Sequence, residues 1–190
     1  MATTNGVNVE QLLSTIEAIK ENPSLAEFMF RAQTEWIEGG HTRTKIQGFY
    51  GAGEEDTSRA EPLYLEGDEP PVLLGSNAGP NAVETALHAL ASCLAVGFVY
   101  NAAAEGIRVD ALDFELEGEI DLHGFLGLSD DVRPGYKNIS LVYRVDCDAP
   151  REKIVKLCEY VKRTSPVLDL IRNPVPVSVR LAERTAKARA

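Results

Sequence analysis

Three cysteines, Cys93, Cys147 and Cys158, are the side chains best suited to covalent chemistry in this sequence. A thiolate is a nucleophile that can be oxidised reversibly, so a free cysteine offers redox chemistry. Cys147 lies in an alternating apolar run and Cys158 in a helical apolar stripe, and both patterns predict small packing residues. Cys93 lies deep in an apolar helical stretch among small residues that let a ligand approach. On these patterns alone an inert buried thiol is the simpler interpretation of Cys93, because a thiol in mid-helix gains little from the helix dipole.

A reactive thiol requires a nearby cation, and predicted strands supply Arg31, Arg43 and Lys45 as candidates. The histidines are dispersed, and no His-x3-His or Cys-x2-Cys pair places two metal ligands on one face. Glu84 and His88 are four residues apart, which favours a hydrogen-bonded helical pair over a metal site. Phosphate loops, dinucleotide fingerprints and nucleophile elbows are absent from the sequence. We therefore expect neither a metal nor a cofactor.

The element that must position Cys93 is a helix that follows a turn at residues 79–81 and ends near Glu105, with Gly106 as the residue after the C-cap. Its apolar positions recur at steps of three and four, and its other face carries small residues, so most sides should be buried. Residues 85–104 are nearly long enough to span a bilayer. His88, Asn101 and acidic flanks favour a core helix instead.

The remaining elements alternate between amphipathic helices and strands. Asn8 is a predicted N-cap for the first helix, Asp148 for a later one and Ser165 for a short one before Pro166. Residues 51–61 are predicted to be an exposed loop. In chain order we expect a helix at 5–20, strands at 28–36, 41–50, 62–66 and 71–74, the central helix, strands at 112–122 and 139–147, a helix pair, and a final strand at 175–181. This order indicates an α+β fold with antiparallel sheets around helices.

Composition limits the classes of partner. The 190 residues carry a net charge of −10, which argues against nucleic acid and anionic membranes. An odd number of cysteines gives no disulfide framework. Free thiols, together with the lack of an amino-terminal signal pattern, predict a cytoplasmic protein.

Two motifs resemble those of the OsmC/Ohr family. Residues 79–94 (GPNAVETALHALASCL) resemble its central-helix motif, and residues 162–167 (KRTSPV), followed by a short helix and the strand residues 175–179 (VPVSV), resemble its second motif. The resemblance covers roughly residues 28–181. We therefore divide the chain into an amino-terminal helical extension at 1–27 and an OsmC-like domain at 28–190.

This resemblance implies an intertwined homodimer with antiparallel sheets wrapped around long central helices. It also implies reduction of organic hydroperoxides by a cysteine on the central helix, which becomes a sulfenic acid and condenses with a second cysteine. The resemblance further implies that an arginine and a glutamate polarise the thiolate and that an external dithiol restores it.

Carried over by position, the resemblance implies that Cys93 is the reactive thiol, with Arg43 and Glu84 as its polarising residues. Nine residues of helix separate Glu84 from Cys93, a rotation of about 180°. Glu84 therefore reaches Cys93 only if the first turn is irregular or a partner subunit contributes it.

The second motif departs from the family, because Ser165 stands where the resolving cysteine is expected. Serine cannot form the disulfide, and Cys158, about two helical turns earlier, could replace it only if its helix presents it to Cys93. Our leading hypothesis is thus a homodimer that reduces hydroperoxides through Cys93 with an external thiol as the resolving partner. The alternative is a non-enzymatic protein that binds a small apolar or electrophilic ligand at the dimer interface.

Overall fold

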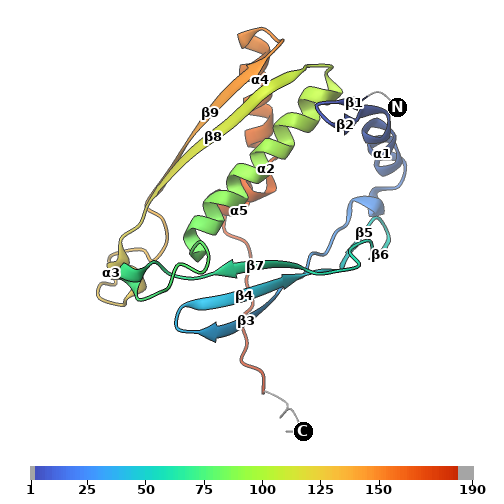
Figure 1. Ribbon diagram of the computed structural model, residues 1–190. Coiled ribbons are helices and arrows are strands. Elements are labelled where there is room, and N and C mark those ends of the chain that lie inside the picture. Colours follow the sequence, from blue (N-terminus) through green and yellow to red (C-terminus); the bar gives the residue numbers. More distant parts are fainter. Residues whose placement is uncertain (1–2, 184–190) are drawn as a thin grey trace.

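The computed structural model describes residues 3–183 of the chain. Figure 1 shows its centre, a long helix, α2 (Ala82–Ala104), flanked by a ribbon of two long strands and by helix α4 (Arg151–Thr164). A three-stranded sheet lies to the other side of α2, and the carboxyl-terminal residues run past it. The mixed architecture of helices and small antiparallel sheets confirms the predicted α+β class.

Helix α2 begins and ends as its sequence predicts. The Asn81 side chain accepts a hydrogen bond from the Glu84 amide, and the Glu84 carboxylate accepts one from the Asn81 amide, each at 2.9 Å. This capping box satisfies two amides that the first turn leaves free. At the other end Gly106 follows the C-cap Glu105 with φ of +70°, a conformation that favours glycine.

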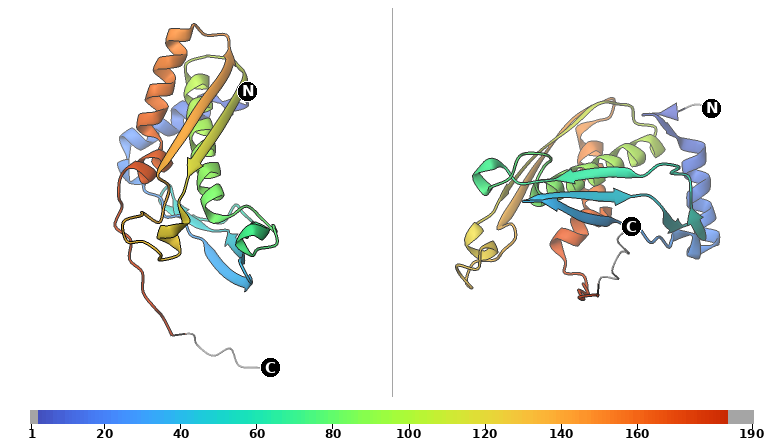
Figure 2. Two further views of the ribbon diagram at one scale, coloured as in Figure 1. Left: turned by 90° about the vertical axis from the view of Figure 1, so that its left-hand side faces the viewer. Right: turned by 60° about the horizontal axis from the view of Figure 1, so that its bottom comes forward.

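The strands β8 (Val109–Glu119) and β9 (Asn138–Cys147) form an antiparallel ribbon with the alternating burial that the sequence predicts. Their inward side chains, including Leu116 and its cross-strand partner Leu141, pack on the core. Helix α5 (Pro166–Arg172) follows α4 after Ser165. Figure 2 shows the ribbon lying along α2, with α4 beside both.

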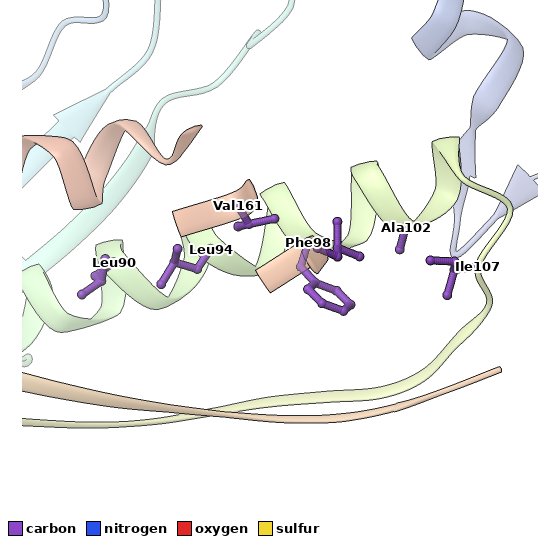
Figure 3. Close-up of a cluster of buried hydrophobic side chains, with 7 residues drawn as sticks. Leu90, Leu94, Phe98, Ala102, Ile107 and Val161 are labelled. Atoms are coloured by element: carbon purple, nitrogen blue, oxygen red, sulfur yellow. The ribbon is translucent and has the colours of Figure 1, made fainter. Parts of the chain in front are cut away.

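The buried apolar residues come from α2, α4 and the turn between α2 and β8. Phe98 and Ala102 of α2 have no exposed surface, and Val161 of α4 is 1% exposed. Figure 3 shows these side chains in one row along α2. The clustered core consists of Leu90, Leu94, Phe98, Ala102, Ile107, Leu157 and Val161. Helix α2 is long and apolar enough to cross a membrane by length and composition, as core helices of soluble proteins also are.

The second sheet has the order β3 (Gln33–Glu38), β4 (His41–Ile46), β7 (Leu63–Gly67), all antiparallel. A separate hairpin pairs β5 (Phe49–Gly51) with β6 (Glu54–Asp56). The prediction of a loop at 51–61 was wrong for Gly51 and residues 54–56, which are strand residues, but residues 57–61 form no helix or strand, as predicted. Ala52 and Gly53 both have positive φ, which gives the tight turn that suits a twisted hairpin.

Three further predictions were wrong. Residues 71–74 are not a strand, because Pro71 starts the short 3-10 helix η2 (Pro71–Leu73). Helix α4 has Pro150 as its N-cap residue, and the Asp148 carboxylate instead accepts a hydrogen bond from the Arg108 amide at 2.8 Å. The predicted final strand at 175–181 forms no ladder within the described chain. Figures 1 and 2 show it extending away from α2.

The amino-terminal segment comprises β1 (Thr3–Thr4), β2 (Val7–Asn8), α1 (Val9–Glu21) and the 3-10 helix η1 (Pro23–Ala26). Asn8 caps α1 by accepting a hydrogen bond from the Gln11 amide, as predicted. The Asn5 side chain donates to Ile107 and accepts from the Val109 amide, both at 2.9 Å. Residues 3–8 are therefore tied to the turn between α2 and β8. A one-turn helix, α3 (Leu122–Phe125), lies in the connection between β8 and β9.

Candidate functional site

The sulfur of Cys93 lies beside the hydroxyl of Ser165, with Sγ and Oγ 3.1 Å apart. Ser165 is 5% exposed and is the N-cap of α5, where its oxygen accepts a hydrogen bond from the Leu168 amide at 3.2 Å. A serine hydroxyl has a single proton. With the oxygen engaged in the cap, that proton is free to be donated to the sulfur. The motif at residues 79–94 and the motif at residues 162–167 are thus in contact through these two atoms.

A cavity of about 430 Å³ opens at this pair. It lies where α2 meets the end of α4 and the start of α5. Gly97, one turn after Cys93, allows the close approach, because a Cβ atom there would lie 3.0 Å from Val161 Cγ1. The lining residues are Ser92, Cys93, Val96, Gly97, Val161, Thr164, Ser165 and Pro166. A cavity that is mostly apolar and contains a thiol beside one hydroxyl group is suited to binding a small, weakly polar ligand.

The Arg43 guanidinium lies on β4, where its Nε is 2.6 Å from Glu66 Oε1 on β7. His41 Nε2 lies 2.8 Å from the other oxygen of the same carboxylate. These contacts raise the pKa of Arg43 and lower that of Glu66, mainly through their shared hydrogen bond. Within residues 3–183 no hydrogen bond joins Arg43 to Cys93. The structure of one chain therefore places this candidate cation on the three-stranded sheet, paired with Glu66.

Glu84 is occupied by the capping box at the start of α2. Because the first turn is regular, Glu84 lies about 13 Å along the axis and half a turn around the helix from Cys93. The two side chains of one chain therefore point to opposite faces. Glu84 could therefore contact only the Cys93 of another subunit.

Cys158 lies on α4, but it lines a different cavity, between α2, β9 and α5. Burial raises the pKa of the Cys158 thiol, and the neighbouring Glu159 adds to this effect. Its sulfur is therefore held as a poorly nucleophilic thiol. All three cysteines are free, and Cys147 packs against the core from β9 as the sequence predicts.

Sequence patterns did not identify two features of the site, the close approach at Gly97 and the contact between Cys93 and Ser165. Gly97 is the one glycine inside an otherwise apolar helix, a signal that marks close packing. Contact between side chains 72 positions apart leaves no trace in local periodicity. Within the described residues, no group of three or more His, Cys, Asp or Glu side chains could hold a metal ion.

Comparison with solved structures supports the fold. An OsmC-like protein from Mycoplasma pneumoniae aligns with a TM-score of 0.58 and 14% identity over 76% of this chain and 88% of its own. A putative osmotic stress induced and detoxification response protein from Psychrobacter arcticus aligns with a TM-score of 0.57 and 15% identity, covering 77% and 90%. An organic hydroperoxide resistance protein OsmC from Legionella pneumophila aligns with a TM-score of 0.50 and 15% identity, covering 76% and 89%.

A search of curated protein sequences finds no match. The family described as OsmC-like protein matches residues 75–180, which is more than half of the chain and includes both Cys93 and Ser165. The matched region begins before α2 and ends after α5, so it contains the whole core and the candidate site. The chain belongs to the OsmC-like protein family.

Proposed function

We propose that this protein is a homodimeric, thiol-dependent reductase of organic hydroperoxides that uses Cys93 as its reactive group. The observation that carries the proposal is the position of Cys93 at the wall of a cavity, with its sulfur 3.1 Å from the Ser165 hydroxyl oxygen. The name of the Legionella pneumophila structure, an organic hydroperoxide resistance protein, is consistent with this chemistry. The Ser165 hydroxyl can donate its hydrogen bond to the thiolate before the reaction or, after oxidation, to the oxygen on the sulfur.

The proposed reaction balances with an external thiol. The Cys93 thiolate attacks the distal oxygen of the hydroperoxide, the O–O bond breaks, and an alcohol leaves after taking up one proton. The sulfur, now a sulfenic acid, condenses with an external thiol to give a mixed disulfide and water. A second external thiol releases Cys93 and leaves as a disulfide. The external thiol is required because Ser165 has no sulfur and Cys158 faces another cavity.

In the proposed homodimer, Arg43 of one subunit lies close to Cys93 of the other. The three-stranded sheet that carries Arg43 has an exposed apolar surface, which a second subunit would cover. A guanidinium next to the sulfur favours the thiolate by charge attraction. Replacing Arg43 by Gln should therefore slow peroxide reduction at least roughly tenfold, whereas Arg31→Gln, which breaks a pair with Glu55, should not.

The direct test is a stopped-flow measurement of thiol loss with cumene hydroperoxide. We expect one thiol equivalent to be consumed, faster than free cysteine reacts, and the consumption to disappear in Cys93→Ser but persist in Cys158→Ser. Dimedone should trap a sulfenic acid on Cys93. A Cys93 that reacts no faster than free cysteine would contradict the proposal.

The contact between Cys93 and Ser165 provides a second test. In Ser165→Cys, the new sulfur lies within reach of Cys93 Sγ, so peroxide should convert the pair to an intramolecular disulfide. Non-reducing peptide mapping would detect it, with Arg163→Cys, an exposed neighbour outside the cavity, as the matched control. If peroxide produces no such disulfide, the distance between the two side chains in solution differs from the one described.

A second candidate function is a binding protein in which Cys93 lines the ligand cavity without turning over. The observation that favours it is the serine at position 165, which has a complete role as the N-cap of α5. In that case Cys93→Ser should retain ligand affinity, and the wild-type protein should show no peroxidase activity with dithiothreitol, glutathione or a dihydrolipoyl donor.

A further inference from the structure

A second cavity, larger than the one at Cys93, lies against a neighbouring face of α2. It measures about 680 Å³ and is bounded by α2, β9, α4, α5 and the connection between β8 and β9. Cavities that hold small organic ligands have volumes of roughly 300–1,000 Å³. Cys93 and Ser165 do not line it, so its lining is distinct from that of the cavity at Cys93.

The inner wall of this cavity is apolar. Leu90 and Leu94 of α2 are 3% and 2% exposed, so they are fixed by the core behind them. Leu141 of β9 and Leu168 of α5 complete this surface and pack against the same core. A wall fixed in this way is largely formed before a ligand arrives, which reduces the ordering cost of binding.

The rim of the cavity is cationic, although the protein as a whole has a net charge of −10. Arg133, Lys137, Lys162 and Arg172 line it, against the single carboxylate of Glu159. Lys162 is paired with Glu159 at 2.8 Å, and Lys137 is paired with Asp121 outside the cavity at 3.0 Å.

Two of the rim cations have no counterion. Within residues 3–183, Arg133 and Arg172 have no carboxylate within 4.0 Å. Both are exposed, so their charges are available to an incoming anion. Guanidinium groups bind carboxylates in a planar, two-point geometry that ammonium groups cannot match.

The same cavity contains an unsatisfied donor. The Tyr143 hydroxyl is buried and has no hydrogen-bond partner among residues 3–183. Burial raises the pKa of Tyr143 to about 12, so the phenol stays protonated at neutral pH. A buried hydroxyl without a partner costs free energy, and such groups in proteins usually meet a water or a ligand.

We propose that this cavity binds a monoanionic amphiphile, a carboxylate with an unbranched chain of about ten carbons. The carboxylate pairs with Arg133 and Arg172 at the rim, and the chain lies along Leu90, Leu94 and Leu168. The charge pattern and the apolar wall together select this class. A neutral alcohol of the same length leaves both guanidinium groups unpaired, and a short carboxylate such as acetate leaves the apolar wall exposed.

Isothermal titration of the native protein with decanoate, 1-decanol and acetate tests the proposal. We expect saturable binding of one decanoate per chain, binding of 1-decanol at least roughly tenfold weaker, and no measurable binding of acetate. In the double variant Arg133→Gln/Arg172→Gln the decanoate affinity should fall at least roughly tenfold, while the decanol affinity stays unchanged. Arg151→Gln, which removes an exposed arginine outside the cavity, is the matched control.

The cysteines report which cavity is occupied. Cys158 lines the proposed cavity and Cys93 the other, so saturating decanoate should slow iodoacetamide labelling of Cys158 and leave that of Cys93 unchanged. Decanoate affinity should be the same in Cys93→Ser, which separates this proposal from the peroxidase proposal. Equal affinity for decanoate and decanol, unchanged affinity in the double arginine variant, protection of Cys93 instead of Cys158, or no binding because a second subunit fills the cavity would each overturn it.

Discussion

The two halves of this molecule differ in how they bury apolar side chains. The half built from α2, β8, β9 and α4 has its own core, with Phe98 fully buried and Val161 almost so. The half built from β3, β4, β7 and the β5–β6 hairpin leaves large apolar side chains at the surface, including Phe30 and Trp36, each 72% exposed. The extended carboxyl-terminal residues are similar, with Val179 91% exposed.

This difference means that one half buries its apolar side chains within the chain, whereas the other leaves an apolar surface that a partner could cover. Contiguous exposed apolar surface of this kind marks an interaction site in soluble proteins. Helix α2 shares both properties. It contributes most of the core, yet only 17% of its most apolar segment is buried within the chain. A second copy of the chain is the simplest partner that could cover these exposed apolar surfaces, which supports the proposed homodimer.

The largest effect is expected for substitutions in the core. Phe98→Ala should lower the free energy of unfolding by about 3–5 kcal/mol, because it removes a fully buried ring and leaves a cavity. Phe30→Ala, a change of the same type in the exposed half, should alter the stability of the monomer by much less. Urea unfolding at low protein concentration measures both. Equal losses in the two variants would mean that the two halves share one core.

The next effect concerns the extended residues 175–181. Placing Asp at both Val177 and Val179 should shift the proposed homodimer towards monomer, since the two side chains lie on the same face of an extended chain. Ser178→Asp adds a charge on the other face and should leave the dimer intact. Sedimentation equilibrium gives the mass of each variant. A dimer that survives the double substitution would exclude this segment from the interface.

A smaller effect is expected where α2 and α4 approach most closely. Gly97→Ala places a methyl group 3.0 Å from Val161, a residue that is already fully packed. We expect a loss of about 1–3 kcal/mol from overpacking, with a slower Cys93 reaction as the helices separate. Gly48→Ala, where the added carbon meets only an ordinary 3.7 Å contact, serves as control. Unchanged stability in Gly97→Ala would show that α4 moves freely.

The smallest predicted effect depends on pH. Asp68 is buried and accepts hydrogen bonds from the Ser76 hydroxyl and from the amides of Glu69, Ser76 and Ala78, which lower its pKa well below the ordinary value. A depressed carboxyl pKa adds stability above the unfolded-state pKa of about 4, and this contribution is lost as pH falls.

Asp68→Asn should therefore unfold at lower urea than the wild type at pH 7, and the gap should narrow as the pH falls below about 4. The difference between the urea midpoints of the two proteins should be measured from about pH 2 to about pH 7, a range that spans the unfolded-state pKa. Asp113→Asn, which removes an exposed carboxylate from β8, controls for the change in net charge. A gap that stays constant with pH would assign the effect to packing instead of ionisation.

Local patterns predicted the central half of the fold well. The helix around Cys93, the alternation of β8 and β9 and the caps at Asn8 and Ser165 follow from periodicity and from hydrogen bonds between residues three positions apart. Predictions failed where a local signal competed with another contact. Asp148 has the type of an N-cap but bonds to Arg108, and the residues of β6 become a strand only through the turn at Ala52 and Gly53.

By itself the sequence determined that a long apolar helix carries Cys93, that a short helix begins at Ser165, and that the chain has the motifs of its family. Only the tertiary structure decided that Cys93 and Ser165 are in contact, that Cys158 faces another cavity, and that Arg43 pairs with Glu66. The physical reason is the range of the interactions. Caps and amphipathic faces are set by neighbours within one or two turns, whereas a site is set by how helices and strands pack across tens of residues.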